Sequence, residues 1–158
     1  MGGVEQRLTL GFFEKLFTPE HERSLVEGLR SFVRGDEEGA LSRLEETEEI
    51  ADALFMSGYM YLKRENFDKA VEKLREALHA GSELSMYFHK YGLKMSFYLP
   101  ITEHVRAQVE PSEEGVLLGL IEAEQEMGLL EQALEDARKL REMDSDDPAA
   151  LLSLVELL

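Results

Sequence analysis

Few residues of this 158-residue chain stand in a pattern that could do covalent chemistry. The chain has no cysteine, which excludes disulfides, thiolate metal clusters and cysteine nucleophiles. None of its histidines has the paired spacing of a metal site; they are His21, His79, His89 and His104. A His-Glu-x-x-His motif, a phosphate-binding glycine loop and a Gly-x-Ser-x-Gly motif are also missing from the sequence. We therefore expect no enzyme, no metal site and no cofactor.

One segment has the composition of a recognition surface. Between Glu83 and Glu103 lie 19 residues without a carboxylate, although the chain has 33 Asp and Glu against 17 Lys and Arg. This segment combines cations with aromatic rings: His89, Lys90, Lys94, Tyr87, Phe88, Tyr91, Phe97 and Tyr98. Aromatic residues are enriched at the cores of protein interfaces, which makes the segment a candidate contact surface. For any single ring, packing inside the core is the alternative.

Charge and hydropathy exclude other partners. A formal charge of −16 argues against nucleic acid, because binding it requires clustered cations that neutralise phosphates. No apolar run approaches the roughly 20 residues of a membrane span, and no uninterrupted run resembles a signal-peptide core. The expected location is therefore the cytoplasm. The length suits one domain or a short row of repeats.

The elements that position these residues are expected to be helices. Apolar residues recur mostly at spacings of three and four, and no segment shows the sustained alternation of a strand. The prolines are interpreted as helix starts; they are Pro19, Pro100, Pro111 and Pro148. We therefore predict an all-α protein of about ten helices joined by short turns.

Internal repetition favours a solenoid of helix-turn-helix units over a generic bundle. Three turn positions stand five residues before an alanine: Gly35, Glu65 and Gly128 precede Ala40, Ala70 and Ala133. The unit recurs about four times, and its predicted copies are residues 19–50, 51–82, 83–110 and 111–147.

The second copy, residues 51–82, has small and apolar residues in the order and spacing of the tetratricopeptide repeat. These residues are Leu54, Gly58, Tyr61, Phe67, Ala70, Leu74 and Ala77. Gly58 and Ala70 lack bulk where two helices must approach closely. On these residues the chain resembles the tetratricopeptide-repeat family. The resemblance implies a right-handed α–α superhelix whose first helices line a concave groove for a peptide or helix of a partner protein.

The resemblance also implies which residues line the groove. They are Asp52, Phe55, Met56, Tyr59 and Lys63 in the second copy, and Met86, His89, Lys90, Leu93 and Phe97 in the third. This set predicts an apolar groove with a basic edge, and hence a scaffold or adaptor for an acidic or amphipathic partner. A small acidic chaperone for secreted proteins, of the same repeat type, is one alternative. A regulatory or sensory fragment of a larger protein is the other.

The two ends of the chain carry separate predictions. Residues 1–18 are expected to form an amphipathic helix that packs on the first repeat, with a membrane surface as the less favoured alternative because the net side-chain charge of this segment is zero. Residues 148–158 are predominantly apolar. They are expected to start a further repeat, to fold back on the last one, or to pair with a second molecule through Leu151, Leu154, Val155 and Leu158.

Overall fold

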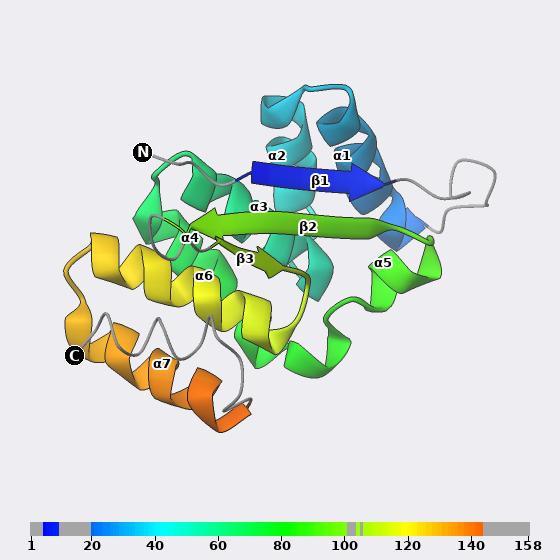
Figure 1. Ribbon diagram of the computed structural model, residues 1–158. Helices are drawn as coiled ribbons and strands as arrows, with labels where there is room; N and C mark the ends of the chain where they lie inside the picture. Colours follow the sequence, from blue (N-terminus) through cyan, green and yellow to red (C-terminus); the bar gives the residue numbers. More distant parts are fainter. Residues whose placement is uncertain (1–4, 10–19, 101–103, 105, 144–158) are drawn as a thin grey trace.

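The computed structural model describes residues 5–9, 20–100, 104 and 106–143 (Figure 1). As predicted, the protein is predominantly helical; the described residues contain seven α-helices, two 3-10 helices and, unexpectedly, a three-stranded sheet. The α-helices are α1 (Arg23–Val33), α2 (Glu37–Glu45), α3 (Ala51–Lys63), α4 (Phe67–His79), α5 (Met86–Lys90), α6 (Glu113–Glu126) and α7 (Leu130–Met143). The 3-10 helices are η2 (Glu20–Glu22) and η3 (Gly81–Glu83), and the strands are β1 (Glu5–Thr9), β2 (Lys94–Pro100) and β3 (Arg106–Val109). None of these helices is long and apolar enough to cross a membrane.

Three helical hairpins, α1–α2, α3–α4 and α6–α7, form most of the fold. They pack in succession, because α2 contacts α3 and α4 contacts α6. The turn of each hairpin contains one residue with a positive φ: Gly35 at 86°, Glu65 at 60° and Gly128 at 77°. These are the three turn positions that precede an alanine by five residues in the sequence. A helix that ends in a left-handed residue satisfies its last carbonyl groups with the following N–H groups.

Small residues allow the helices of a hairpin to approach, as expected for Gly58. A Cβ atom added to Gly58 would lie only 2.7 Å from the Leu74 side chain, and one added to Gly28 would lie 3.2 Å from Leu44. Close packing therefore favours glycine at position 58 most strongly, whereas at Gly28 the Leu44 side chain would have to move by only a few tenths of an ångström. The tetratricopeptide superhelix itself and the count of ten helices remain predictions.

Replacing Glu65 by glycine is expected to raise the free energy of unfolding by up to about 1 kcal/mol. A left-handed backbone costs a residue with a side chain about 1–2 kcal/mol, and the greater freedom of glycine in the unfolded chain offsets part of this gain. Urea denaturation measures the difference. Glu72→Gly, at an exposed position inside α4, is the control and should lower the stability by about 1 kcal/mol. A Glu65→Gly protein no more stable than the parent would contradict the prediction.

The sheet is the part of the fold that the sequence prediction missed. Its order is β1-β2-β3 and both pairings are antiparallel, with Glu5 opposite Tyr98, Thr9 opposite Lys94, and Leu99 opposite Ala107. The helix predicted for residues 1–18 is therefore wrong over residues 5–9, which form β1. The third predicted repeat, residues 83–110, is also wrong, because it contains the short helix α5 followed by the strands β2 and β3.

The segment forms a strand rather than a helix because of its inward-facing residues, which lie in β2 and at the position before it. They recur at a spacing of two and are all buried: Leu93, Met95, Phe97 and Leu99. This is the period of a strand with one covered face. Pro100, interpreted as a helix start, instead ends β2.

The inner face of the sheet packs on α3, which is buried from Ala51 to Leu62. The Phe97 ring of β2 stacks on the Tyr59 ring of α3, with 4.6 Å between ring centroids and 17° between ring planes. The Tyr59 hydroxyl donates a hydrogen bond of 2.5 Å to the carbonyl oxygen of Gly115 at the start of α6. Helix α3 thus lies at the centre of the core, in contact with α2, α4, α5, α6 and the sheet.

A buried ionic cluster joins α4 to the third hairpin. The Arg75 guanidinium of α4 donates two hydrogen bonds to Asp136 of α7, of 3.0 and 2.9 Å, and one of 3.0 Å to Glu124 of α6. Both acids are almost fully buried. Burial, together with a hydrogen bond to Asp136, raises the pKa of Glu124 to about 8. Burial opposes ionisation of Asp136 as well, but the hydrogen bonds from Arg75 and Glu124 lower its pKa. One Arg therefore neutralises Asp136, while Glu124 holds a proton near neutral pH.

Candidate functional site

Six residues predicted to line an open groove lie in the core instead: Asp52, Phe55, Met56, Tyr59, Leu93 and Phe97. The prediction of an open groove at these positions is wrong, because the strand β2 and the helix α5 cover the face of α3 on which the groove was expected. The covering segment comes from the chain itself. Any surface that a partner can reach must therefore lie on the outer side of α5 and the sheet.

Asp52 has a structural role in holding that segment. Its carboxylate accepts hydrogen bonds from the backbone N–H groups of Tyr87 at 2.8 Å and Phe88 at 3.1 Å, and from that of Ser85. Burial raises the pKa of Asp52, and the three N–H groups act in the opposite direction. The aspartate of α3 thus fixes the first turn of α5.

Two predicted cations of the groove are held in ion pairs within the chain. The Lys63 ammonium lies 2.9 Å from Glu37 of α2, and the Lys90 ammonium lies 2.6 Å from the buried carboxylate of Glu22. The Tyr91 hydroxyl also donates to Glu22. Both lysines therefore stabilise contacts between elements. The two remaining predicted residues, Met86 and His89, are exposed on α5.

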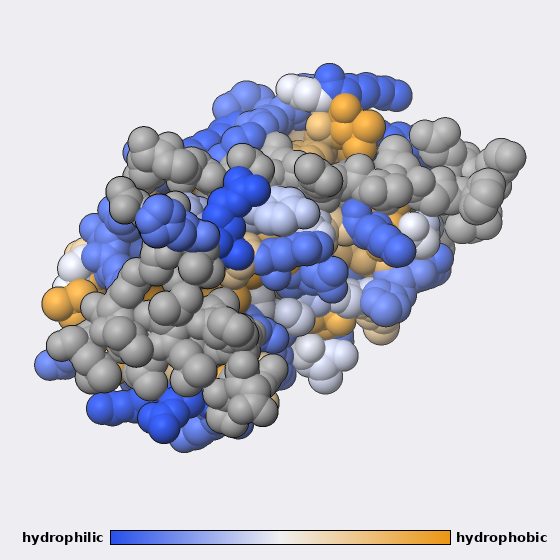
Figure 2. Space-filling view, viewed as in Figure 1, coloured by the Kyte–Doolittle hydropathy of each residue, from blue (hydrophilic) through white to orange (hydrophobic). Residues whose placement is uncertain are grey.

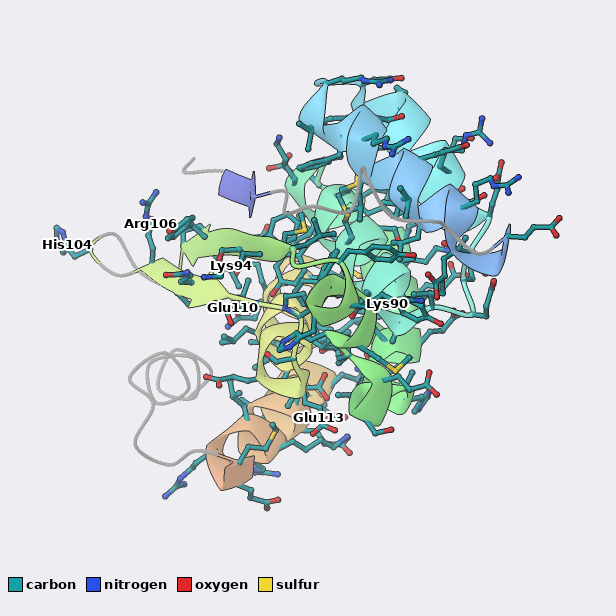
Figure 3. The ribbon with its side chains drawn as sticks, turned by 90° about the vertical axis from the view of Figure 1, so that its right-hand side faces the viewer. Lys90, Lys94, His104, Arg106, Glu110 and Glu113 are labelled. Atoms are coloured by element: carbon teal, nitrogen blue, oxygen red, sulfur yellow. The ribbon has the colours of Figure 1, made fainter. Side chains whose placement is uncertain are left out.

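The outer side of β2 and β3, together with His89 of α5, forms what we call the cationic face. Its described residues are His89, Lys94, Ser96, Tyr98, Arg106 and Gln108, all exposed or half-buried. The Arg106 guanidinium lies 5.3 Å from the centroid of the Tyr98 ring, and the Gln108 amide donates a 3.0 Å hydrogen bond to Ser96. Figure 3 shows Lys94, Arg106 and His104 on this side of the molecule, with Lys90 on α5.

Figure 2 shows that the described residues on the side viewed in Figure 1 are mostly hydrophilic. A small hydrophobic patch lies at the left margin, over the turn between α6 and α7, where Leu129 and Leu130 are exposed. The cationic face is therefore distinguished by its charge. The strands β2 and β3 contain no carboxylate, although Glu110 directly follows β3 and lies near Lys94 (Figure 3).

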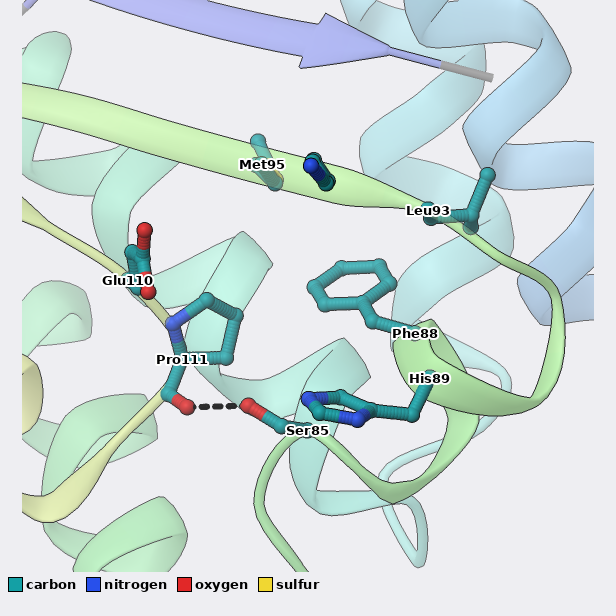
Figure 4. A pocket seen from close by; sticks show the side chains of 8 residues that line it. Ser85, Phe88, His89, Leu93, Met95, Glu110 and Pro111 are labelled. Carbon is teal, nitrogen blue, oxygen red and sulfur yellow. Dashed lines mark hydrogen bonds between the residues drawn. The ribbon is translucent and has the colours of Figure 1, made fainter. Parts of the chain in front are cut away.

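A cavity of about 250 Å³ opens at the end of the cationic face, between α5, β2 and the segment before α6 (Figure 4). Buried apolar side chains form its floor: Phe88, Leu93, Met95 and Pro111. More polar side chains form its rim: Ser85, His89, Lys94 and Glu110. We call this cavity the α5–β2 pocket. The pocket therefore combines apolar and polar groups, and its accessible lining is more polar than apolar.

Ser85 fixes one side of the pocket. Its backbone has a φ of 71°, in the left-handed region that residues with side chains seldom adopt. Its N–H group donates to Asp52, and its hydroxyl donates to the carbonyl oxygen of Pro111 (Figure 4). Strain of this kind persists where the surrounding contacts fix the backbone. The contacts of Ser85 therefore hold α5 and the segment before α6 in one arrangement.

The pocket offers binding contacts. In the part of the chain that the structure describes, no hydrogen bond joins the side chains of Ser85, His89 and Glu110, and no group of three His, Asp or Glu side chains could hold a metal ion. The Lys94 ammonium has no ion-pair or hydrogen-bond partner among the same residues. What the site supplies is an available cation beside an apolar floor.

The segment that the sequence suggested as a contact surface contributes some, but not all, of the residues of the cationic face and the α5–β2 pocket. Lys94 and Tyr98 belong to the carboxylate-free segment, but Ser85, Arg106, Glu110 and Pro111 were not predicted. The alternation of Leu93, Met95, Phe97 and Leu99 is the signal that places Lys94 outward. The proposed dimer contacts Leu151, Leu154, Val155 and Leu158 lie outside the described residues.

The fold and the site together define a protein of packed helical hairpins with an inserted sheet and an exposed cationic face. No family model matches this chain, and no curated protein matches it.

Proposed function

We propose that this protein is an interaction adaptor that binds an acidic or amphipathic segment of a partner protein on the cationic face. The observation that carries the proposal is the separation of charge: in a chain of formal charge −16, the described elements α5, β2 and β3 contain no carboxylate but contain Lys90, Lys94 and Arg106. Facing patches of opposite charge accelerate encounter and fix the orientation of a complex. A cytoplasmic location is part of the proposal.

We also propose that the three hairpins belong to a tetratricopeptide-like superhelix. The recurrence of a left-handed turn residue five positions before an alanine supports this assignment. In such an arrangement α3 would face the concave side. Because α5 and β2 already cover α3, the partner binds the outer side of these two elements rather than the helix itself.

The proposed function is tested by affinity capture from a native lysate, in which the parent protein is compared with a variant whose cationic face has reversed charges. The variant is Lys94→Glu combined with Arg106→Glu, and the control is Arg34→Glu combined with Arg138→Glu, two exposed arginines outside the cationic face. Both variants change the charge by the same amount. We expect the parent and the control to retain the same proteins, and the face variant to bind the purified partner at least about ten-fold more weakly, a loss of about 1.4 kcal/mol.

Circular dichroism and urea denaturation establish that both variants are folded. Because the contact is electrostatic and exposed, the affinity of the parent should also fall as the salt concentration rises. Equal retention by the face variant, or no retained protein with the parent, would contradict the proposal.

A further inference from the structure

The α5–β2 pocket has the size of a site for one side chain. Its volume of about 250 Å³ is below the roughly 300–1,000 Å³ that is typical of small-molecule and cofactor sites. At protein interfaces a few large side chains inserted into such pockets supply most of the binding energy. Phe88, Leu93, Met95 and Pro111 form the apolar part of the lining, which an apolar side chain could contact.

The pocket is held in its open shape by contacts that do not depend on a ligand. The Asp52 carboxylate fixes the first turn of α5 through hydrogen bonds from backbone N–H groups. The Ser85 hydroxyl, at the start of α5, donates a hydrogen bond to the carbonyl oxygen of Pro111. A site that is already ordered loses less conformational entropy when a partner binds. The strained φ of Ser85 belongs to this fixed wall.

The rim determines the charge of the occupant. Lys94 and His89 stand on it as cationic or ionisable groups, and Glu110 is its one carboxylate. The Lys94 ammonium has no partner among the described residues, and the cationic face continues from it along β2 and β3. A carboxylate next to the inserted side chain would supply the partner that Lys94 lacks.

We propose that the α5–β2 pocket is the anchor site for the partner segment: it takes one large apolar side chain, and Lys94 pairs with an acidic residue beside it. This inference rests on the proposed function and deepens it by naming the recognised sequence, an apolar residue flanked by carboxylates. Burial of a leucine-sized side chain therefore accounts for at least about a ten-fold difference in affinity.

Three blocked heptapeptides test the anchor: a central leucine between two runs of three glutamates, the same peptide with serine for leucine, and the same peptide with lysine for every glutamate. They are titrated into the 15N-labelled full chain, and amide chemical shifts report the site and the affinity. We expect the leucine–glutamate peptide to shift amides of α5, of the start of β2 and of residues 110–112. The serine peptide should bind at least ten-fold more weakly, and the lysine peptide should not bind.

Two rim variants sharpen the test. Lys94→Glu should abolish binding of the leucine–glutamate peptide, whereas Glu110→Lys should strengthen it at least three-fold by removing the opposing carboxylate. The matched control for the second is Glu126→Lys, at an exposed position near the end of α6, which should leave the affinity unchanged.

The outcomes separate the two proposals. Equal binding of the leucine and serine peptides, with both lost in Lys94→Glu, would overturn the anchor and leave the cationic face as the binding surface. Shifts confined to another surface, such as the turn between α6 and α7, would also overturn it. If no peptide binds while the parent still captures a partner that depends on Lys94 and Arg106, the anchor is wrong and the function stands. If neither binds, both fail.

Discussion

Arg75→Met is expected to lower the free energy of unfolding by about 3–5 kcal/mol, because it leaves the buried Asp136 carboxylate without its cation and removes a hydrogen bond to the buried Glu124. Asp136 accepts both parallel hydrogen bonds of the guanidinium, and Glu124 accepts a third. Methionine replaces the aliphatic stem of Arg75 but not its charge. The substitution should weaken mainly the packing of α4 against the third hairpin, because the three residues come from α4, α6 and α7.

Urea denaturation at pH 7 measures the effect. The control Arg138→Met removes an exposed arginine of α7 and is expected to change the stability by less than about 0.5 kcal/mol. Hydrogen exchange should show the largest loss of protection in α6 and α7. A loss from Arg75→Met no greater than that of the control would show that the cluster does not stabilise the fold.

The protonation of Glu124 gives this cluster a defined pH dependence. The folded-state pKa of Glu124 is raised to about 8 from an ordinary value of 4.5, mainly by burial. Between these two values the folded protein binds a proton that the unfolded chain has released, so stability falls as the pH rises through this window. Glu124→Gln keeps the uncharged shape, so it should cost little at pH 6 and should remove the fall in stability between pH 6 and 8. An unchanged pH profile in Glu124→Gln would assign the dependence to other groups.

The second large effect is expected from Asp52→Ala, at about 3 kcal/mol or more. The substitution leaves three backbone N–H groups of the α5 turn without their acceptor, and each unsatisfied buried donor costs about 1–3 kcal/mol. Ser85 should be affected most, because its left-handed backbone is maintained by these contacts. The amides of Ser85, Tyr87 and Phe88 should exchange with solvent faster than in the parent.

Asp36→Ala is the matched control for Asp52→Ala. Asp36 also accepts a backbone N–H, from Gly39 at 2.9 Å, but it caps α2 on the surface. The loss of an exposed cap costs about 1 kcal/mol. Equal losses in the two variants would mean that water replaces Asp52 at the α5 turn. Asp52→Ala should also weaken binding of the leucine–glutamate peptide, because the pocket wall is no longer fixed.

The helical hairpins could be predicted because each is specified by neighbouring residues. The pairing of Gly58 with Leu74 across one hairpin, and the turn at Glu65 between them, lie within one stretch of the chain. The first hairpin has the same kind of contact, between Gly28 and Leu44, and the third shares the left-handed turn residue, Gly128. Close helix packing and turn conformation are both visible in a short sequence window.

The sheet could not be predicted in the same way, because its central strand has partners that are remote in the sequence. β2 pairs with β1, about ninety residues earlier, and no local feature of either segment identifies the other. The aromatic residues of 86–98 also fit a helical surface. Only the burial of every second residue from Leu93 to Leu99 distinguishes the strand.

The difference between the 3.6-residue period of a helix and the two-residue period of a strand explains which site residues were predicted wrongly. On a helix, His89, Lys90, Leu93 and Phe97 share one face, which is why they were expected to line a groove together. The structure ends α5 at Lys90 and continues as a strand, so Leu93 and Phe97 turn inward and Lys94 turns outward. That this segment is a contact surface stays a prediction; the assignment of its two faces depended on the secondary structure.

The pairing of β1 with β2 has a consequence for how the protein is made. The ribosome completes β1 long before β2 emerges, so the first strand waits unpaired while the first two hairpins form from local contacts. Closing so long a loop is entropically unfavourable, and contacts of high sequence separation slow folding. Sheet assembly over α3 is therefore a late event in biogenesis. Until it occurs, Phe55 and Tyr59 of α3 lack the contact with Phe97 of β2.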